Sequence, residues 1–293
     1  MIGKVLLGLL ILILSGCILN GYEKPPAKLT SAFSGAISLV DVTGVSEEGE
    51  VVHQANISGR FQTHEKPKPQ GIRRFPLNLQ KGTRAVQCQL FTSENGGDSR
   101  AEVEKGLSVG PLFLGTPTSS QEIQIPEVQQ GIYQKELLPH YSPGIYLLRA
   151  QGVAQKNAFQ IDFSMPEELR EPKVNSHGLL EGPAVVQKSA DFLLEIEPAT
   201  APNDLNIIEM SLITQTPTEE RVLVCGALES QLETVNGKTQ MKVPSAQLSG
   251  LLATPSGAIQ ILRVNALGGV VQNGPTLTLE GLRAWVWPSL VAE

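Results

Sequence analysis

The chain has 293 residues, of which 41% are hydrophobic and 18% are charged, and its formal net charge is −6 at pH 7. These proportions allow a packed core and exclude a wholly disordered chain. The negative charge is spread along the sequence, which excludes the concentrated basic surface of a nucleic-acid binder, so no nucleic-acid partner is expected. The 28 glycines and 20 prolines favour strands and turns over long helices.

The N-terminus has the layout of a secretory signal. Lys4 supplies a positive charge, and residues 5–14 form an almost wholly apolar run. Two small residues then precede Cys17, which is the arrangement found at a signal-peptide cleavage site. The apolar run is shorter than the about 20 residues that a membrane-spanning helix needs. We therefore expect residues 1–16 to be a signal peptide.

The end of this segment resembles the lipobox of bacterial lipoprotein precursors. The resemblance implies that signal peptidase II recognises Leu14, Ser15 and Gly16 and cuts before Cys17. It also implies a diacylglyceryl group on the Cys17 thiol and an acyl chain, such as palmitate, on the new amine. Several acyl chains hold a protein stably at a membrane. Ile18 stands where inner-membrane lipoproteins carry Asp, which implies the outer membrane of a Gram-negative cell envelope.

Strand patterns dominate the first half of the mature chain. Residues 17–30 are polar and proline-bearing, which is typical of a tether. Segments rich in β-forming residues follow at residues 32–40, 51–61, 84–92, 101–114, 122–125, 144–151 and 157–163. Residues 165–182 are poor in strand signals and carry prolines, which remove sheet hydrogen bonds. We predict a first β-sandwich domain over residues 31–170.

The second half has the same character. Strands are predicted at residues 191–196, 206–214, 220–226, 258–264 and 276–286. Asn236-Gly237, flanked by alternating residues, predicts a hairpin with a type I′ turn over residues 232–243. A second domain is expected over residues 171–293. The sequence therefore predicts an all-β protein with two antiparallel immunoglobulin-like sandwiches.

The later part of the chain is also similar to β-rich lipoproteins of predatory and gliding bacteria. The resemblance rests on a strand that reaches Cys225, a strand that ends at Pro244, a short helix with Leu251-Leu252 and a buried strand. It extends over residues 107–290 and implies no particular activity.

The three cysteines include Cys88 and Cys225, which both lie in predicted strands. If Cys17 is lipidated, these two remain in an oxidising compartment, where a disulfide is permitted. Two separate thiols that pack in the core as small hydrophobic side chains are the alternative. The sequence leaves both open.

Catalytic and ligand-binding motifs are represented by one weak match. Residues 106–110 fit the pattern G-x-S-x-G, in which Ser108 would be a nucleophile at a turn between a strand and a helix. A strand or loop is predicted after Ser108, so we treat the match as chance and a serine hydrolase as a minor alternative. The histidines are too scattered for a zinc site and stand at His53, His64, His140 and His177. No metal or cofactor is expected.

Aromatic residues make up only 5% of the chain, which limits any glycan-binding platform. The candidates other than phenylalanine are Trp285, Trp287, Tyr133, Tyr141 and Tyr146. Trp285 and Trp287 share one face of a predicted strand, which is more typical of core or interface residues than of an exposed sugar-binding platform.

These observations predict a lipid-anchored lipoprotein of the cell envelope that is not an enzyme and acts as a binding or structural module. Its membrane contact would be the N-terminal lipid. A surface module for glycan binding or adhesion is the alternative. The sequence does not choose between an envelope protein and a glycan as partner.

Overall fold

The computed structural model describes residues 33–45, 50–63, 86–94, 106–116, 121–137, 141–153, 157–170, 172–178, 181–200, 206–270 and 276–293. The lipobox, the tether, His64 and His140 lie outside these residues. Strands dominate the described chain, and the predicted all-β class is confirmed. Its helical elements are short: the 3₁₀ turn η2 (Glu229–Gln231) and the helix α2 (Ser245–Leu248).

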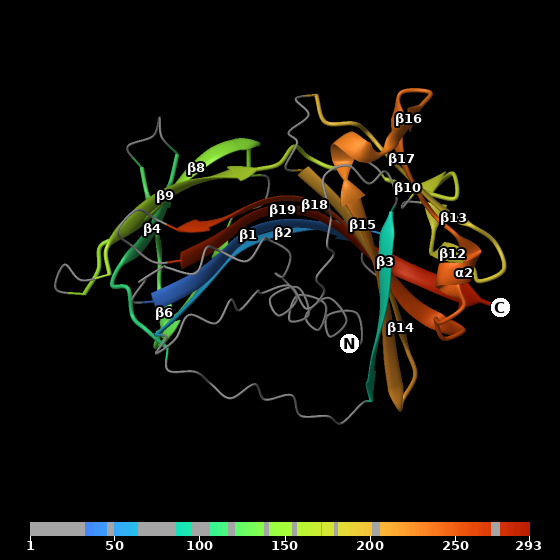
Figure 1. The fold of residues 1–293 in the computed structure, drawn as a ribbon, viewed down its shortest axis with the longest axis horizontal. Coiled ribbons are helices and arrows are strands. Elements are labelled where there is room, and N and C mark those ends of the chain that lie inside the picture. Colours follow the sequence, from blue (N-terminus) through green and yellow to red (C-terminus); the bar gives the residue numbers. More distant parts are fainter. Residues whose placement is uncertain are drawn as a thin grey trace.

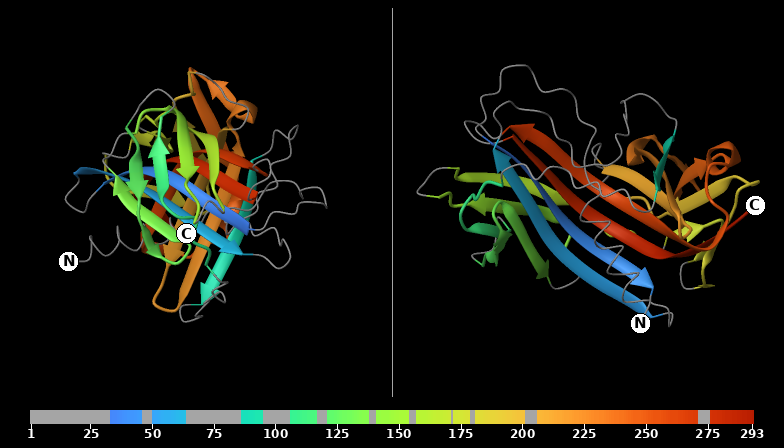
Figure 2. Two further views of the ribbon diagram at one scale, coloured as in Figure 1. Left: turned by 90° about the vertical axis from the view of Figure 1, so that its left-hand side faces the viewer. Right: turned by 90° about the horizontal axis from the view of Figure 1, so that it is seen from below.

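A ten-stranded central sheet runs through the whole molecule in the order β3-β15-β14-β18-β19-β1-β2-β7-β6, with β12 also paired to β19. Figures 1 and 2 show its longest strands side by side along the length of the protein. The strands are β1 (Phe33–Val45), β2 (Val51–Thr63), β3 (Gln87–Glu94), β6 (Glu127–Gln129), β7 (Ile132–Leu137), β12 (Ala184–Gln187), β14 (Asn206–Gln215), β15 (Glu219–Leu228), β18 (Thr254–Val270) and β19 (Thr276–Ala292).

Two smaller sheets lie at opposite ends of the central sheet (Figure 1). The four-stranded sheet has the order β5-β4-β8-β9, and the five-stranded sheet has the order β11-β10-β13-β17-β16. The strands of the first are β4 (Leu112–Gly115), β5 (Ile123–Ile125), β8 (Gly144–Ala150) and β9 (Phe159–Met165). Those of the second are β10 (Lys173–Val174), β11 (His177–Gly178), β13 (Phe192–Ile196), β16 (Glu233–Val235) and β17 (Lys238–Val243).

The predicted hairpin of the second half is confirmed. β16 and β17 pair in antiparallel fashion on either side of Asn236-Gly237. Both turn residues have positive φ, 51° at Asn236 and 75° at Gly237, as a type I′ turn requires.

Each small sheet packs on the same face of the central sheet and encloses a core. On β19, Leu277 and Leu279 belong to one core, and Trp285 and Trp287 belong to the other. These residues are separated by even numbers of positions, so their side chains leave the strand on the same side. We call this side the core face. The cluster with the two tryptophans is the tryptophan core, and the cluster with Leu277, which includes four phenylalanines, is the phenylalanine core.

The two sandwiches share one sheet, and this differs from the prediction of two separate antiparallel ones. The central sheet takes β1, β2, β3, β6 and β7 from the first half of the chain and the others from the second. β1 pairs with β19 in parallel, whereas β2 pairs with β1 antiparallel. Residues 166–170, where a boundary was predicted, connect the four-stranded to the five-stranded sheet. Alternating hydrophobicity identifies strands but does not encode which strands become neighbours.

A belt of buried charge separates the two cores. Arg263 on β18 lies directly opposite Arg283 on β19. Arg283 pairs with Asp41 of β1, and Arg263 donates to Glu229 at 2.6 Å. Arg263 is only 1% exposed. Two like charges at neighbouring buried positions are tolerable because each arginine has its own carboxylate.

The same arginines hold the segment that joins the small sheets. Arg283 Nε donates to the carbonyl of Pro166 at 3.2 Å, and an amino group of Arg263 donates to that of Glu168 at 3.0 Å. The Trp285 indole N–H donates to the carbonyl of Leu169. Backbone groups buried in a non-strand segment need such partners, so the belt fixes the crossing point between the sheets.

Candidate functional site

The predicted lipid-attachment site, Cys17, and the residues that precede it lie outside the described part of the chain. The anchor therefore stays a prediction from the sequence. Across the residues that the structure describes, no helix is long and apolar enough to cross a membrane.

Ser108 lies in a loop that leads into β4, and its surroundings do not form a nucleophile elbow. Gly110, with φ of 70°, and Pro111 follow it, and the chain then enters a strand. The elbow requires a helix at this point to expose the hydroxyl on a strained turn. The Ser108 hydroxyl instead donates to Glu127 Oε2 at 2.8 Å.

Glu127 and Tyr133 bind the Ser108 loop to the β6–β7 hairpin. The second oxygen of Glu127 accepts from the backbone N–H of Gly131 at 2.7 Å. The Tyr133 hydroxyl accepts from the N–H of Val109 at 3.0 Å and donates to the carbonyl of Gly110 at 2.9 Å. Burial raises the pKa of Tyr133, so the hydroxyl stays protonated and able to donate. These hydrogen bonds therefore fasten the Ser108 loop to the β6–β7 hairpin.

The described histidines are engaged away from Ser108. His53 Nδ1 bonds with the Thr43 hydroxyl at 3.1 Å, and His177 Nδ1 lies 2.9 Å from the carbonyl oxygen of Asn175. Within the described ranges, no group of three or more His, Cys, Asp or Glu side chains is placed to hold a metal ion.

The tryptophans that could have formed a glycan platform are buried. Trp285 is 7% exposed and Trp287 is 2% exposed, and both belong to the tryptophan core. Their interpretation as core residues on one strand face is confirmed. Tyr133 and Tyr146 are buried in the phenylalanine core, and Tyr141 packs against it. These five residues therefore do not present a shared surface to a sugar.

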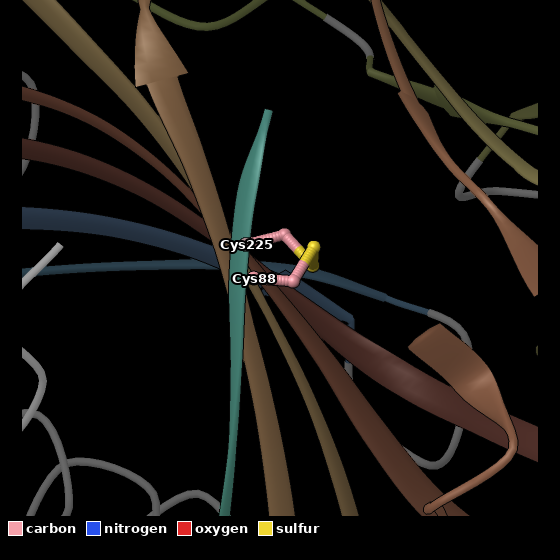
Figure 3. The surroundings of a disulfide bond; sticks show 2 residues. All are labelled: Cys88 and Cys225. Atoms are coloured by element: carbon pink, nitrogen blue, oxygen red, sulfur yellow. A yellow bond between two sulfur atoms is a disulfide. The ribbon is translucent and has the colours of Figure 1, made fainter. Parts of the chain in front are cut away.

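Cys88 and Cys225 form a disulfide (Figure 3). The two residues lie directly opposite each other on β3 and β15. The bond joins positions that are 137 residues apart in the chain and fastens the strand at the edge of the central sheet to its neighbour. Of the two alternatives that the sequence left open, the structure has the bridge.

The central sheet carries a second apolar surface, on the side opposite the core face, which we call the aliphatic face. Its buried members come from β1, β14, β15, β18 and β19, and Val222 of β15 packs against them. They are Ala36, Val40, Val42, Ile207, Ile213, Leu228, Ala258, Leu262, Val264, Ala266, Leu282, Ala284 and Val286. All are aliphatic, and every described member lies on this one sheet.

The aliphatic face was not among the features predicted from the sequence, although the sequence carries a signal for it. Strands that are buried on one side alternate, whereas strands that are buried on both sides read as continuous apolar runs. Ile207-Ile208 in β14 and Ile261-Leu262 in β18 are such runs, with neighbouring residues on opposite faces.

The chain matches no known protein-family model, and a search of curated proteins finds no similar sequence.

Proposed function

We propose that the protein is a lipid-anchored lipoprotein of the cell envelope that acts as a non-enzymatic binding or structural module. The lipobox-like residues 14–17 supply the anchor, and the position of Ile18 favours the outer membrane. The membrane contact is the lipid on Cys17.

The Cys88–Cys225 disulfide is the observation that best supports export. Disulfides persist in oxidising compartments such as the periplasm or the cell surface and are rare in the cytosol. The lipobox and the disulfide are independent features at different places in the chain, and both fit an envelope protein. The structural engagement of Ser108 with Glu127 supports a non-catalytic role for that serine.

Intact mass of the membrane-extracted protein tests this proposal. We expect a chain that begins at Cys17 and carries the mass of a diacylglyceryl group and a further acyl chain. Cys17→Ser, or growth with globomycin, an inhibitor of signal peptidase II, should abolish the processed, triacylated form. The double variant Cys88→Ala/Cys225→Ala is the matched control, because it removes two cysteines and should still be lipidated. An unmodified wild-type chain, or one cut elsewhere, would refute the proposed anchor.

A further inference from the structure

Within the described part of the chain, one edge of the central sheet lacks the features that usually protect sheet edges. β3 is the terminal strand in the order, and β15 is its one neighbour among the described strands. Exposed edge strands can pair with another chain, and proteins block this with short strands, charges, prolines or bulges. β3 has eight residues, Gln-Cys-Gln-Leu-Phe-Thr-Ser-Glu, and its single charge is at its end.

The other sheet edges in the described chain do carry such features. β5, β6 and β16 have three residues each, β11 has two, and β12 has four. β6 also has a register shift in its pairing with β7. β9 is longer but carries Asp162 at its centre. β3 therefore differs from them by being both long and uncharged over seven consecutive residues.

The disulfide shows which backbone groups of β3 face outward. Opposite residues in an antiparallel pair alternate between close pairs, about 4.5 Å between Cα atoms, and hydrogen-bonded pairs, about 5.5 Å. The Cα atoms of Cys88 and Cys225 are 4.1 Å apart, so this is a close, non-hydrogen-bonded pair. The N–H and C=O groups of Cys88, Leu90 and Thr92 consequently point away from β15.

This edge is self-complementary. If two copies of β3 pair antiparallel about a two-fold axis at Leu90, Leu90 lies opposite Leu90 of the other copy, and Cys88 lies opposite Thr92. The outward groups then form about six interchain hydrogen bonds. Leu90, which is 38% exposed, gains an apolar partner.

We propose that the protein forms a homodimer by antiparallel pairing of β3 with β3 of a second copy, which joins the two central sheets. Symmetric, isologous contacts are the commonest in soluble oligomers. The disulfide preorganises the edge, because it holds β3 on β15 and keeps the outward groups in line. The dimer does not depend on the lipid anchor, so the two proposals can fail separately.

Two substitutions interfere with the dimer by different means. Thr92→Pro removes one outward N–H and leaves the hydrogen bonds to β15 in place. Leu90→Lys brings two ammonium groups together at the two-fold axis. Thr92→Val and Leu90→Met are the matched controls, since they keep the N–H group and the neutral side chain.

Sedimentation equilibrium of the membrane-extracted full chain, in an excess of detergent micelles, reads out the association. We expect a dimer for the wild type and both controls, and at least a tenfold weaker dimer for Thr92→Pro and Leu90→Lys. Resistance of both cysteines to alkylation without reductant checks that each variant still folds with its disulfide. A monomeric wild type at 100 micromolar, or a dimer that persists unchanged in both variants, would overturn the proposal.

Discussion

Glu229 should be among the least replaceable charged residues of the protein. It is buried in the belt between the two cores and accepts hydrogen bonds from Arg263 at 2.6 Å, from the Asn206 amide at 3.2 Å and from the N–H of Ala199 at 3.2 Å. Glu229→Gln keeps the shape of the side chain but removes its charge. Arg263 would then be a buried cation that has only neutral partners.

The expected loss of stability follows from this burial. Removal of one partner from a buried ion pair costs about 3–5 kcal/mol, because the other charge stays uncompensated. The glutamine can still accept part of the three hydrogen bonds, so we expect about 3 kcal/mol. For a large domain this corresponds to a fall of about 6 °C in the melting temperature.

Urea unfolding of the wild type and of Glu229→Gln, both in one detergent, measures this loss in the free energy of unfolding. Glu233→Gln, on the exposed strand β16, is the matched control and should change stability by less than about 0.5 kcal/mol. A double-mutant cycle with Arg263→Met should give a coupling free energy of about 2 kcal/mol between the two residues. A loss below about 1 kcal/mol for Glu229→Gln, with additive effects in the cycle, would refute the assigned role of the pair.

Other predictions concern the disulfide, one close backbone contact and one surface carboxylate. Cys88→Ala/Cys225→Ala should lower the free energy of unfolding by up to about 5 kcal/mol, as measured in urea, because the bond closes a loop of about 137 residues. Gly281→Ala should destabilise by about 1–3 kcal/mol in the same assay, since an added Cβ would lie 2.2 Å from a backbone oxygen of β9, whereas Gly178→Ala should be near neutral. Hydrogen bonds from Lys242 and from a backbone N–H hold the pKa of Asp191 below its usual value. Because the folded pKa is depressed, this carboxylate stabilises the fold above its unfolded pKa and loses that effect as the pH falls through the folded pKa. NMR titration should show the low pKa of Asp191, and Lys242→Met should raise that pKa.

The local structure was readable from the sequence because its causes are local. Asn236-Gly237 supplies the two positive φ angles of its hairpin whatever the rest of the chain does. Trp285 and Trp287 share a face because side chains alternate along any strand. Strand existence and the all-β class follow from the same kind of short-range pattern.

The pairing of distant segments was not readable, because nothing local specifies it. β1 begins at Phe33 and lies beside β19, which begins at Thr276, and their parallel register depends on the whole sheet. The Cys88–Cys225 bridge needed that same long-range geometry to be distinguished from two free thiols. The belt was missed for this reason too, since Asp41 and Arg283 are 242 residues apart in the chain.

The shared sheet leads to a prediction about how the protein unfolds. β19 has 17 residues, and its core face contributes Leu277 and Leu279 to one core and Trp285 and Trp287 to the other. Both tryptophans of the chain lie in the tryptophan core, so their fluorescence reports on that core alone. Leu148→Ala, in the phenylalanine core, should cost about 2–5 kcal/mol because it leaves a cavity at a fully buried position.

If the shared sheet makes the two cores one cooperative unit, Leu148→Ala should lower the urea midpoint of tryptophan fluorescence. The midpoint of the far-ultraviolet circular dichroism signal should then fall by the same amount. Two independent sandwiches would behave differently: the tryptophan midpoint would stay at its wild-type value while part of the circular dichroism signal was lost early. Leu248→Ala, in the tryptophan core itself, is the matched control and should shift the fluorescence midpoint in either case. Cooperative unfolding is expected, because β19, which carries both cores, cannot separate at one end without losing its register with β1 and β18.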